Sequence, residues 1–519
     1  MTQLLTDQLR LMAEHFGDEA GFADLGQETS LSFAVWDARS SALSRGLAAA
    51  GVASGDRVAI HLSVASPLDW VVAYAAIHKA GAVAVPVNTR WVTAELAEIL
   101  AHAEVSAAFT DDDGWDILSG TLSRVGTLRL IVVRDRRAER RAPAGVDVRG
   151  WDDLVSNDGS PFQNPVDDDA MADIVYTSGT TGRPKGVVVR HRNASLIPNG
   201  LPVWTGSGWI FSSPLFTFAG ITAIYNPMKL GLRALYLPRF DTAAWIAAVE
   251  RERPSMAFLV PAMAELLLAD PRFEAADLSS VGLCAVGGAP LAPRTQRRLQ
   301  AAMPAASVSN GYGMTEAGPA YTVLPKEEAE RRVGSVGKAI PPAEFVVVGE
   351  DGSRLPPGAV GELVINNPGR QREYYRDPAA TARTWHGDGL HTGDLARLDD
   401  DGYLYIVGRL KDLIIRGGNN IYAGDVEAVL YEHPAVVEAA VAGVAHEVLG
   451  EDVAAWVVLR PETAVTPEEL MAWASERLAD YKVPRRITLV TSLPRNATGK
   501  VVKDALTQSQ PQPPPPLDG

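Results

Sequence analysis

The chain has 519 residues, of which 46% are hydrophobic and 21% charged. This is an ordinary globular composition, and the length predicts several compact units, because one core seldom grows beyond about 300 residues. Lys and Arg number 48 against 63 Asp and Glu, a formal net charge of −15, so a nucleic-acid partner would need a strong local basic patch. The basic run at 134–141 is interrupted by Asp135, Ala138 and Glu139, which predicts a solvated connector instead.

Cysteine content and hydropathy indicate the cellular compartment. The single cysteine, Cys284, excludes an internal disulfide and a cysteine-cluster metal site. No apolar run in the sequence approaches the roughly 18 residues of a membrane-spanning helix, and acidic residues come too early for a secretory signal. We therefore expect a soluble, cytoplasmic protein with no membrane span and no nucleic-acid partner.

The first part of the chain alternates helices with strands. Helices are predicted at 33–50, 67–79 and 93–102, and strands at 57–62, 82–87 and 128–133. A second series, from 172 to about 310, has predicted strands at 172–177, 234–237, 257–260 and 282–286. This alternation predicts two layered α/β sheets, one for each series.

The pattern changes after residue 333. Short strands divided by Gly and Pro, as at 344–348 and 362–365, predict a small antiparallel, barrel-like unit. After Arg409 the pattern restarts, with a helix from Asp425 that ends before Pro434 and strands near 436–444 and 453–459.

A last helix has a clear start, because Thr466-Pro467-Glu468-Glu469 combines an N-cap hydroxyl, a proline at the first helical position and the glutamate of a capping box. The fold class is thus α/β (mixed α+β). We expect a large N-terminal domain over 1–410, a small α+β C-terminal domain over 411–507, and a Pro-rich, disordered tail over 508–519.

The most informative stretch runs from Tyr176 to Gly186 (YTSGTTGRPKG), directly after a predicted strand. Glycines let backbone N–H groups close on phosphate oxygens, hydroxyls add donors, and Lys185 adds a mobile positive charge. A flexible surface hairpin is the alternative, but eleven residues of this composition disfavour it. It is not a Walker loop, since Lys185 follows Pro184 rather than Gly. The candidate phosphate-binding residues are Thr177, Ser178, Gly179, Thr180, Thr181, Gly182 and Lys185.

This loop resembles the phosphate-loop signature of the adenylate-forming superfamily, which comprises acyl-CoA synthetases, peptide-synthetase adenylation domains and luciferases. Further motifs follow in the family's order, and the resemblance covers about residues 10 to 505. They read GGAP from Gly287, NGYGMTE from Asn310, HTGD from His391, GRLKDLIIRGGNNIY from Gly408 and PRNATGKV from Pro494.

The resemblance implies a role for each motif. The adenine-binding residues would be Gly288, Ala289, Pro290, Gly311 and Tyr312, and the ribose-binding residues Asp394 and Arg409. The catalytic residues would be Thr315 on the α-phosphate, Glu316 as the Mg²⁺ ligand and Lys500 as the adenylation lysine. Lys411 would be the hinge between domains, and Gly417 and Gly418 would form the loop used in the coenzyme A step. The acyl pocket would include Phe216, Thr217, Phe218, Gly220, Gly313 and Met314.

The implied activity is that of an AMP-forming acyl-CoA synthetase, with a carboxylic acid, ATP, Mg²⁺ and coenzyme A as its small-molecule partners. The family commonly has an aromatic-His pair at the pocket entrance, whereas Thr217 stands where the histidine is expected. The stretch 191–216 is also shorter than usual, and Ala423 and Asp425 replace the customary Pro and Glu. Loss of a polar ring, together with the small residues Ala219, Gly220 and Gly313, favours a bulky apolar or polycyclic acid over acetate.

Three other interpretations stay open. The chain could perform only one half-reaction, namely adenylation alone or thioesterification of an adenylate made elsewhere. An amino-acid adenylation module would need an acidic anchor near 215–220, where the sequence has none. A catalytically dead nucleotide-binding scaffold is disfavoured because every catalytic residue type is present. The oligomeric state is open, a homodimer included.

Overall fold

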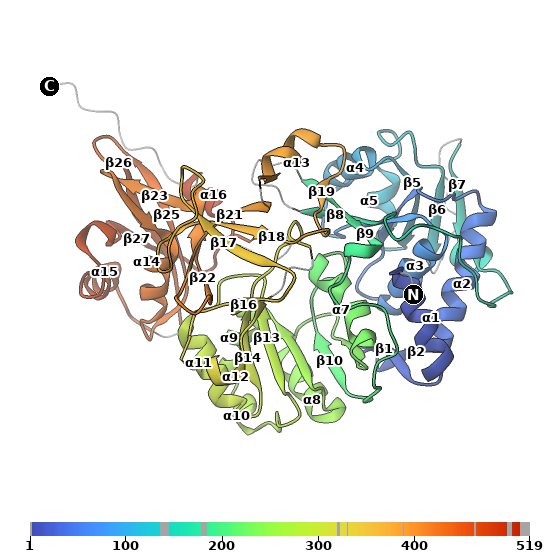
Figure 1. Cartoon of the computed structure of the whole chain (residues 1–519), viewed down its shortest axis with the longest axis horizontal. Helices are drawn as coiled ribbons and strands as arrows, with labels where there is room; N and C mark the ends of the chain where they lie inside the picture. The colour runs from blue at the N-terminus through green and yellow to red at the C-terminus, as the bar shows by residue number, and fades with distance from the viewer. Residues whose placement is uncertain are drawn as a thin grey trace.

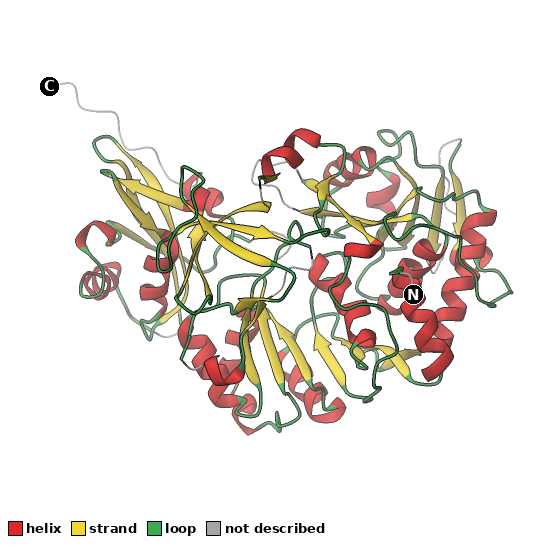
Figure 2. Cartoon of the chain, in the orientation of Figure 1, coloured by secondary structure: helices red, strands yellow, loops and turns green. Residues whose placement is uncertain are grey.

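The computed structural model describes residues 3–134, 145–177, 184–318, 322–329, 331–387, 389–460, 463–495 and 501–508. The basic run beyond Arg134 and the tail from 509 lie outside these ranges. No helix within them is both long enough and apolar enough to cross a membrane. Figure 2 shows sheets covered by helices in the larger part of the molecule and a smaller α+β part beside it.

An eight-stranded sheet occupies the right half of Figure 1. Its order is β19-β9-β8-β4-β3-β5-β6-β7, with β3 (Arg57–His61), β4 (Val83–Pro86), β5 (Val105–Asp111), β6 (Leu130–Arg134), β7 (Asp147–Gly150), β8 (Met171–Thr177), β9 (Lys185–Arg190) and β19 (Glu373–Tyr374). Side chains alternate between its faces: Val58 and Ile60 pack with the core under α2 (Phe33–Ala49) and α3 (Pro67–Lys79), while Ala59 packs with α4 (Thr93–His102). Burial on both faces explains why these strands read as continuous apolar runs.

A seven-stranded sheet lies beside it, at the lower centre of Figure 1. Its order is β14-β13-β12-β10-β11-β1-β2, with β1 (Ala20–Asp24), β2 (Thr29–Ser32), β10 (Gly208–Phe211), β11 (Arg233–Tyr236), β12 (Met256–Leu259), β13 (Leu283–Gly287) and β14 (Ser307–Gly311). The helices linked to it are α1 (Leu5–Phe16), α7 (Phe218–Lys229), α8 (Thr242–Glu252), α9 (Pro261–Ala269), α10 (Pro271–Ala275) and α11 (Pro293–Ala302).

The division of strands between the two sheets differs from the prediction. We assigned 172–177 to the second sheet, but β8 pairs with β4 through Ala84 and Asp173 and so belongs to the first. The second sheet is completed by the N-terminal β1, which pairs in parallel with β11. Chain order alone does not reveal such exchanges, because parallel strands are joined by long crossovers that can return to either sheet. The buried strand β5 was also missed.

The region after residue 333 is antiparallel, as predicted. It comprises β17 (Glu344–Val348), β18 (Gly361–Asn366), β20 (Trp385–His386), β21 (Gly389–Leu398) and β22 (Leu404–Arg409). Among the described residues the pairing follows the open order β17-β18-β21-β20, with β22 on β21. This sheet lies between the two large sheets and the C-terminal part of the chain (Figure 1).

The C-terminal part of the chain follows the short 3-10 helix η2 (Leu410–Asp412) and contains β23 (Leu413–Arg416), β24 (Asn419–Tyr422), α14 (Ala423–Tyr431), β25 (Val436–His446), β26 (Gly450–Leu459), α15 (Pro467–Ser475), β27 (Arg486–Leu489) and α16 (Lys503–Gln508). The predicted capping box is confirmed: the Thr466 hydroxyl accepts from Glu469 N at 3.2 Å, and Thr466 N donates to the Glu469 carboxylate at 2.8 Å. Substituting such a cap typically costs about 1 kcal/mol.

At one glycine, helix propensity alone predicts the wrong direction for the change in stability on substitution by alanine, and this can be tested. Gly46 lies within α2, where alanine is ordinarily about 1 kcal/mol more favourable than glycine. A Cβ at Gly46 would lie 1.8 Å from Leu154 O, at the end of α6 (Trp151–Leu154). We therefore expect Gly46→Ala to destabilise the protein by roughly 1–3 kcal/mol through overpacking, seen as a thermal transition lowered by several degrees. In Gly126→Ala the added Cβ meets no atom within 4 Å, so a comparable loss there would contradict this explanation.

Candidate active site

The sequence motifs meet where parallel strands of the seven-stranded sheet end. β13 and β14 are neighbours, with Gly287 opposite Gly311, so the turn after β13 and the segment after β14 leave the sheet side by side. Carboxyl ends of parallel strands are the usual ligand edge of an α/β sheet. Gly288 has φ +84°, a left-handed conformation that glycine adopts without strain. The predicted adenine-binding residues Gly288, Ala289, Pro290, Gly311 and Tyr312 thus lie on this edge.

Glu316 forms the centre of the site. The hydroxyl of Thr177, the last residue of β8, donates to Glu316 Oε1 at 3.2 Å, and the hydroxyl of Tyr374 on β19 donates to the same atom at 3.3 Å. Both hydrogen bonds go to Oε1, so the two donors orient the carboxylate without engaging Oε2. Burial, and secondarily the charge of Glu316, raises the pKa of Tyr374, which keeps this phenol protonated and a donor.

Lys185 lies on the opposite strand of the same hairpin. It begins β9 and is in register with Thr177 across the pair, and its Nζ lies 4.8 Å from the centroid of the Tyr374 ring. The hairpin therefore brings the first and last predicted phosphate ligands close to Glu316. The intervening candidates, Ser178, Gly179, Thr180, Thr181 and Gly182, lie outside the described residues.

A second cluster surrounds Asp394 on β21. The Tyr312 hydroxyl donates to Asp394 Oδ2 at 2.7 Å, and Arg409 Nε lies 3.0 Å from Asp394 Oδ1. Asp394 and Arg409 face each other in the β21–β22 pair, so the antiparallel sheet fixes their distance. Burial, reinforced by the Asp394 charge, raises the pKa of Tyr312 well above its usual value. Tyr312 links the adenine edge to the predicted ribose-binding pair.

The predicted acyl-pocket residues differ in whether their local packing already accounts for them. Thr217 caps α7: its hydroxyl accepts from Gly220 N at 3.1 Å and donates to Pro214 O at 2.7 Å. A Cβ at Gly220 would lie 2.2 Å from Pro214 O, so this glycine permits a close backbone contact. Gly313, in contrast, is exposed, and a Cβ there would meet no atom within 4 Å. The remaining candidates, Phe216, Phe218 and Met314, are half-buried.

The remaining candidates come from the C-terminal part of the chain. Lys411 belongs to η2, between β22 and β23. Gly417 and Gly418 form the β23–β24 turn with φ +54° and +82°, and Gly417 N donates to Leu449 O of the same domain at 2.9 Å. Lys500 lies outside the described residues.

Sequence reasoning missed two residues of the segment at 370–375: Tyr374, described above, and Arg372. Arg372 is 4% exposed. It donates to Thr315 O at 2.7 Å and to Asn193 O at 2.8 Å, and its guanidinium lies 4.2 Å from the Phe218 ring centroid. It therefore ties the segment after β14 to the start of α7. Neither residue has a periodic or glycine-rich signal in the sequence.

Comparisons with known proteins agree with this geometry. Residues 10–375 match the family model of the AMP-binding enzymes, and residues 425–500 match the model of the AMP-binding enzyme C-terminal domain. The chain belongs to this family. Within it, the chain is an AMP-forming acyl-CoA synthetase.

Three similar proteins represent its relatives. A feruloyl-CoA synthase from an Amycolatopsis species is 36% identical, over 92% of this chain and 93% of that protein. The long-chain-fatty-acid–CoA ligase FadD13 of Mycobacterium tuberculosis is 32% identical, over 94% of each. The structure of ATP-bound MatB from Rhodopseudomonas palustris superposes with a TM-score of 0.85 at 29% identity, over 98% of this chain and 99% of MatB. The fold predicted from the sequence, a large N-terminal and a small C-terminal domain, is confirmed.

The contacts of Arg372 predict the behaviour of Arg372→Lys. Lysine cannot reproduce two diverging hydrogen bonds together with stacking on Phe218, and an unsatisfied buried carbonyl costs about 1–3 kcal/mol. We expect a thermal transition lower by several degrees and a KM for the acid raised about 10-fold, measured by pyrophosphate release. Arg383→Lys, at an exposed position of α13 (Pro378–Thr384), is the control. An unchanged KM for the acid in Arg372→Lys would show that Arg372 does not shape the pocket.

Proposed function

We propose that this synthetase activates a bulky apolar carboxylic acid with ATP and transfers the acyl group to coenzyme A. The observation that carries the proposal is that the site has two clusters. Glu316, Thr177 and Lys185 form the first, and Tyr312, Asp394 and Arg409 form the second. The first group suits a polyphosphate and its metal ion, and the second suits a nucleoside.

Each predicted residue takes its place in this proposal. Adenine lies along the turn after β13 and against Tyr312, and the ribose hydroxyls donate to Asp394 beside Arg409. The phosphates occupy the β8–β9 loop, where hydroxyls, backbone N–H groups and Lys185 neutralise their charge. Thr315 contacts the α-phosphate. Support comes from the 2.7 Å and 3.0 Å contacts that already order Asp394.

The residues present fit a magnesium ion at Glu316. No group of three or more His, Cys, Asp or Glu side chains gathers among the described residues, so a cation here would rely on one carboxylate together with phosphate oxygens and waters. Mg²⁺ prefers that environment. Both hydrogen bonds to Glu316 go to Oε1, so Oε2 would be available to bind the ion. When bound, the ion would neutralise charge on the phosphates. Glu316 would be the protein ligand that holds this ion.

The chemistry proceeds in two steps. The substrate carboxylate oxygen attacks the α-phosphorus of ATP, and the bond to pyrophosphate breaks. The coenzyme A sulfur then attacks the acyl carbonyl carbon, its thiol proton is lost, and the bond to AMP breaks. In the first step the protein supplies position and positive charge, because a carboxylate needs no base to become a nucleophile.

The division of the chain supports a change of domain orientation between the steps. We propose domains at 1–410 and 411–507, with Lys411 as the hinge. Lys500 serves adenylation, and the Gly417–Gly418 turn serves the coenzyme A step. Gly417 and Gly418 form an exposed two-residue hairpin turn with positive φ at both positions, and in this proposal the turn lines the channel for coenzyme A.

A bulky apolar acid is favoured by the residues at the pocket. Thr217 has no ring that could contact a small polar acid, and its hydroxyl is engaged in capping α7. Next to Met314, a Cβ at Gly313 would meet no atom within 4 Å, which leaves space for a larger acid. Two relatives carry the names of a feruloyl-CoA synthase and a long-chain-fatty-acid ligase, in line with a large acyl group. A cytoplasmic location follows from use of ATP and coenzyme A, and a homodimer stays a prediction for sedimentation analysis.

A panel of acids tests the proposed reaction. With Mg-ATP and coenzyme A, we expect pyrophosphate release that depends on long or ring-bearing acids, and acyl-CoA products by mass spectrometry. Acetate should be turned over at least about 10-fold less well, since it fills little of an apolar pocket. Faster turnover of acetate would refute the bulky-acid assignment. No pyrophosphate from any acid, but thioester from a supplied acyl-adenylate, would leave only the second half-reaction.

Lys500→Ala should separate the two steps. Removing a point charge from the transition state of adenylation typically costs about 10²- to 10³-fold in rate, whereas thioester formation from a supplied acyl-adenylate should change by less than about 2-fold. Lys503→Ala is the matched control, because Lys503 Nζ pairs with Glu427 within the C-terminal domain at 2.7 Å. Equal losses in both steps for Lys500→Ala would contradict its assignment to adenylation.

A further inference from the structure

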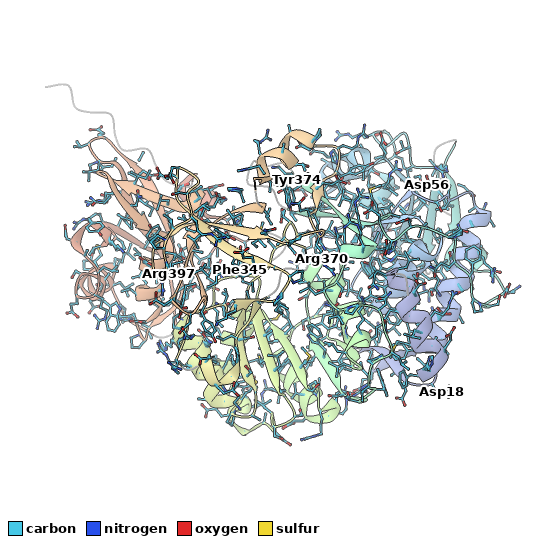
Figure 3. All side chains as sticks on the ribbon, in the orientation of Figure 1. Asp18, Asp56, Phe345, Arg370, Tyr374 and Arg397 are labelled. Atoms are coloured by element: carbon cyan, nitrogen blue, oxygen red, sulfur yellow. The ribbon has the colours of Figure 1, made fainter. Side chains whose placement is uncertain are left out.

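Tyr374 touches two charged groups that the proposed reaction uses. Its hydroxyl donates to Glu316 Oε1, and its ring faces the Lys185 ammonium at 4.8 Å from the centroid. Figure 3 labels Tyr374 at the upper centre, below α13. The anion and the cation approach different parts of one side chain, the phenol oxygen and the ring face.

The Tyr374 side chain is held firmly. It is 9% exposed and packs with Val187 and Ala380, and its ring meets Trp385 edge-on at a centroid distance of 5.2 Å. Its backbone pairs with Val187 of β9, and its backbone N–H donates to the Thr381 hydroxyl at 2.9 Å. A side chain fixed in this way can fix the groups it contacts.

We propose that Tyr374 is a positioning residue that sets the Glu316 carboxylate for the metal ion and the Lys185 ammonium for the phosphates. This proposal rests on the proposed function and extends it to a residue that contacts neither substrate. The hydroxyl holds Glu316 Oε1, so that Oε2 would be the oxygen offered to the metal. The ring face holds Lys185 near the hairpin through a cation–π contact, where it would otherwise swing freely on four methylenes.

The hydroxyl and the ring of Tyr374 make separable contributions to nucleotide binding, the first through Glu316 and the second through Lys185. Tyr374→Phe removes the hydrogen bond to Glu316 and keeps the ring under Lys185. Tyr374→Leu removes both. The first variant should therefore weaken metal-dependent nucleotide binding alone, and the second should weaken nucleotide binding with or without metal.

The neighbouring tyrosine supplies a matched control. Tyr375 directly follows β19 and is half-buried, and its ring packs edge-on against His102 at a centroid distance of 5.9 Å. Tyr375→Phe removes a hydroxyl from the adjacent position and should leave nucleotide binding unchanged. A general effect of losing a phenol in this segment would appear in both variants.

Calorimetric titration of ATP into the full chain, with excess Mg²⁺ or with EDTA, provides the test. For the wild type, tighter binding with Mg²⁺ than in EDTA would support the proposed function independently of Tyr374. For Tyr374→Phe we expect the Kd with Mg²⁺ to rise about 5- to 10-fold, as for a lost hydrogen bond to a charged group, and the Kd in EDTA to stay within about 2-fold. For Tyr374→Leu the Kd in EDTA should also rise, by about 3- to 10-fold.

The two half-reactions give a second readout. A merely structural role of Tyr374 would lower the rates of both half-reactions equally, whereas a positioning role would lower only the first. Acid-dependent ATP–pyrophosphate exchange should fall about 10-fold in Tyr374→Phe, while thioester formation from a supplied acyl-adenylate should stay within about 2-fold of wild type. An unchanged ratio of the Kd values with Mg²⁺ and in EDTA in Tyr374→Phe would overturn the assignment to Glu316. An unchanged Kd in EDTA for Tyr374→Leu would overturn the assignment to Lys185, and equal effects in Tyr375→Phe would overturn both.

Discussion

The hydrogen bonds to the Glu316 carboxylate join parts of the chain that fold separately. Thr177 ends a strand of the eight-stranded sheet, Glu316 follows the last strand of the seven-stranded sheet, and Tyr374 lies on a two-residue strand added to the edge of the first. A carboxylate that is half-buried needs such donors to offset its desolvation. The site exists only when the two large sheets and the 370–375 segment are in their native relation, so its geometry depends on the whole N-terminal domain.

The antiparallel sheet provides the other half of the constraint. Asp394 and Arg409 face each other across β21 and β22, and Tyr312 reaches Asp394 from the end of β14. The nucleoside end of the site is therefore built across two sheets, like the phosphate end. Arg409 is followed directly by η2, which leads to the C-terminal domain. The proposed movement of that domain would thus begin next to a residue that is itself a proposed ribose ligand, which would give a physical route between nucleotide binding and domain orientation.

Packing constraints account for residues that look functional in the sequence. From the sequence, Gly220 was predicted to be a small pocket residue, but it lies against the backbone of Pro214, where a Cβ would not fit. Thr217 was interpreted as a replacement of the family's histidine, and in the structure it is the N-cap of α7. Both residues shape the first turn of α7. Gly313, with open space where a side chain would be, is the position among these three at which a larger residue could enter the site without disturbing the fold.

The sequence by itself determined the local elements and the residue types of the site. Helix caps, apolar runs and glycine-rich turns are local signals, so α3 and β17 were predicted at their observed bounds. A phosphate loop was predicted from hydroxyls, glycines and Lys185, and it stays a prediction. Only the tertiary structure decided that β8 joins the first sheet, because strand pairing depends on long-range crossovers. It also decided that Tyr374 meets Glu316: the two are 58 residues apart, and contacts between distant segments leave no periodic trace in either one.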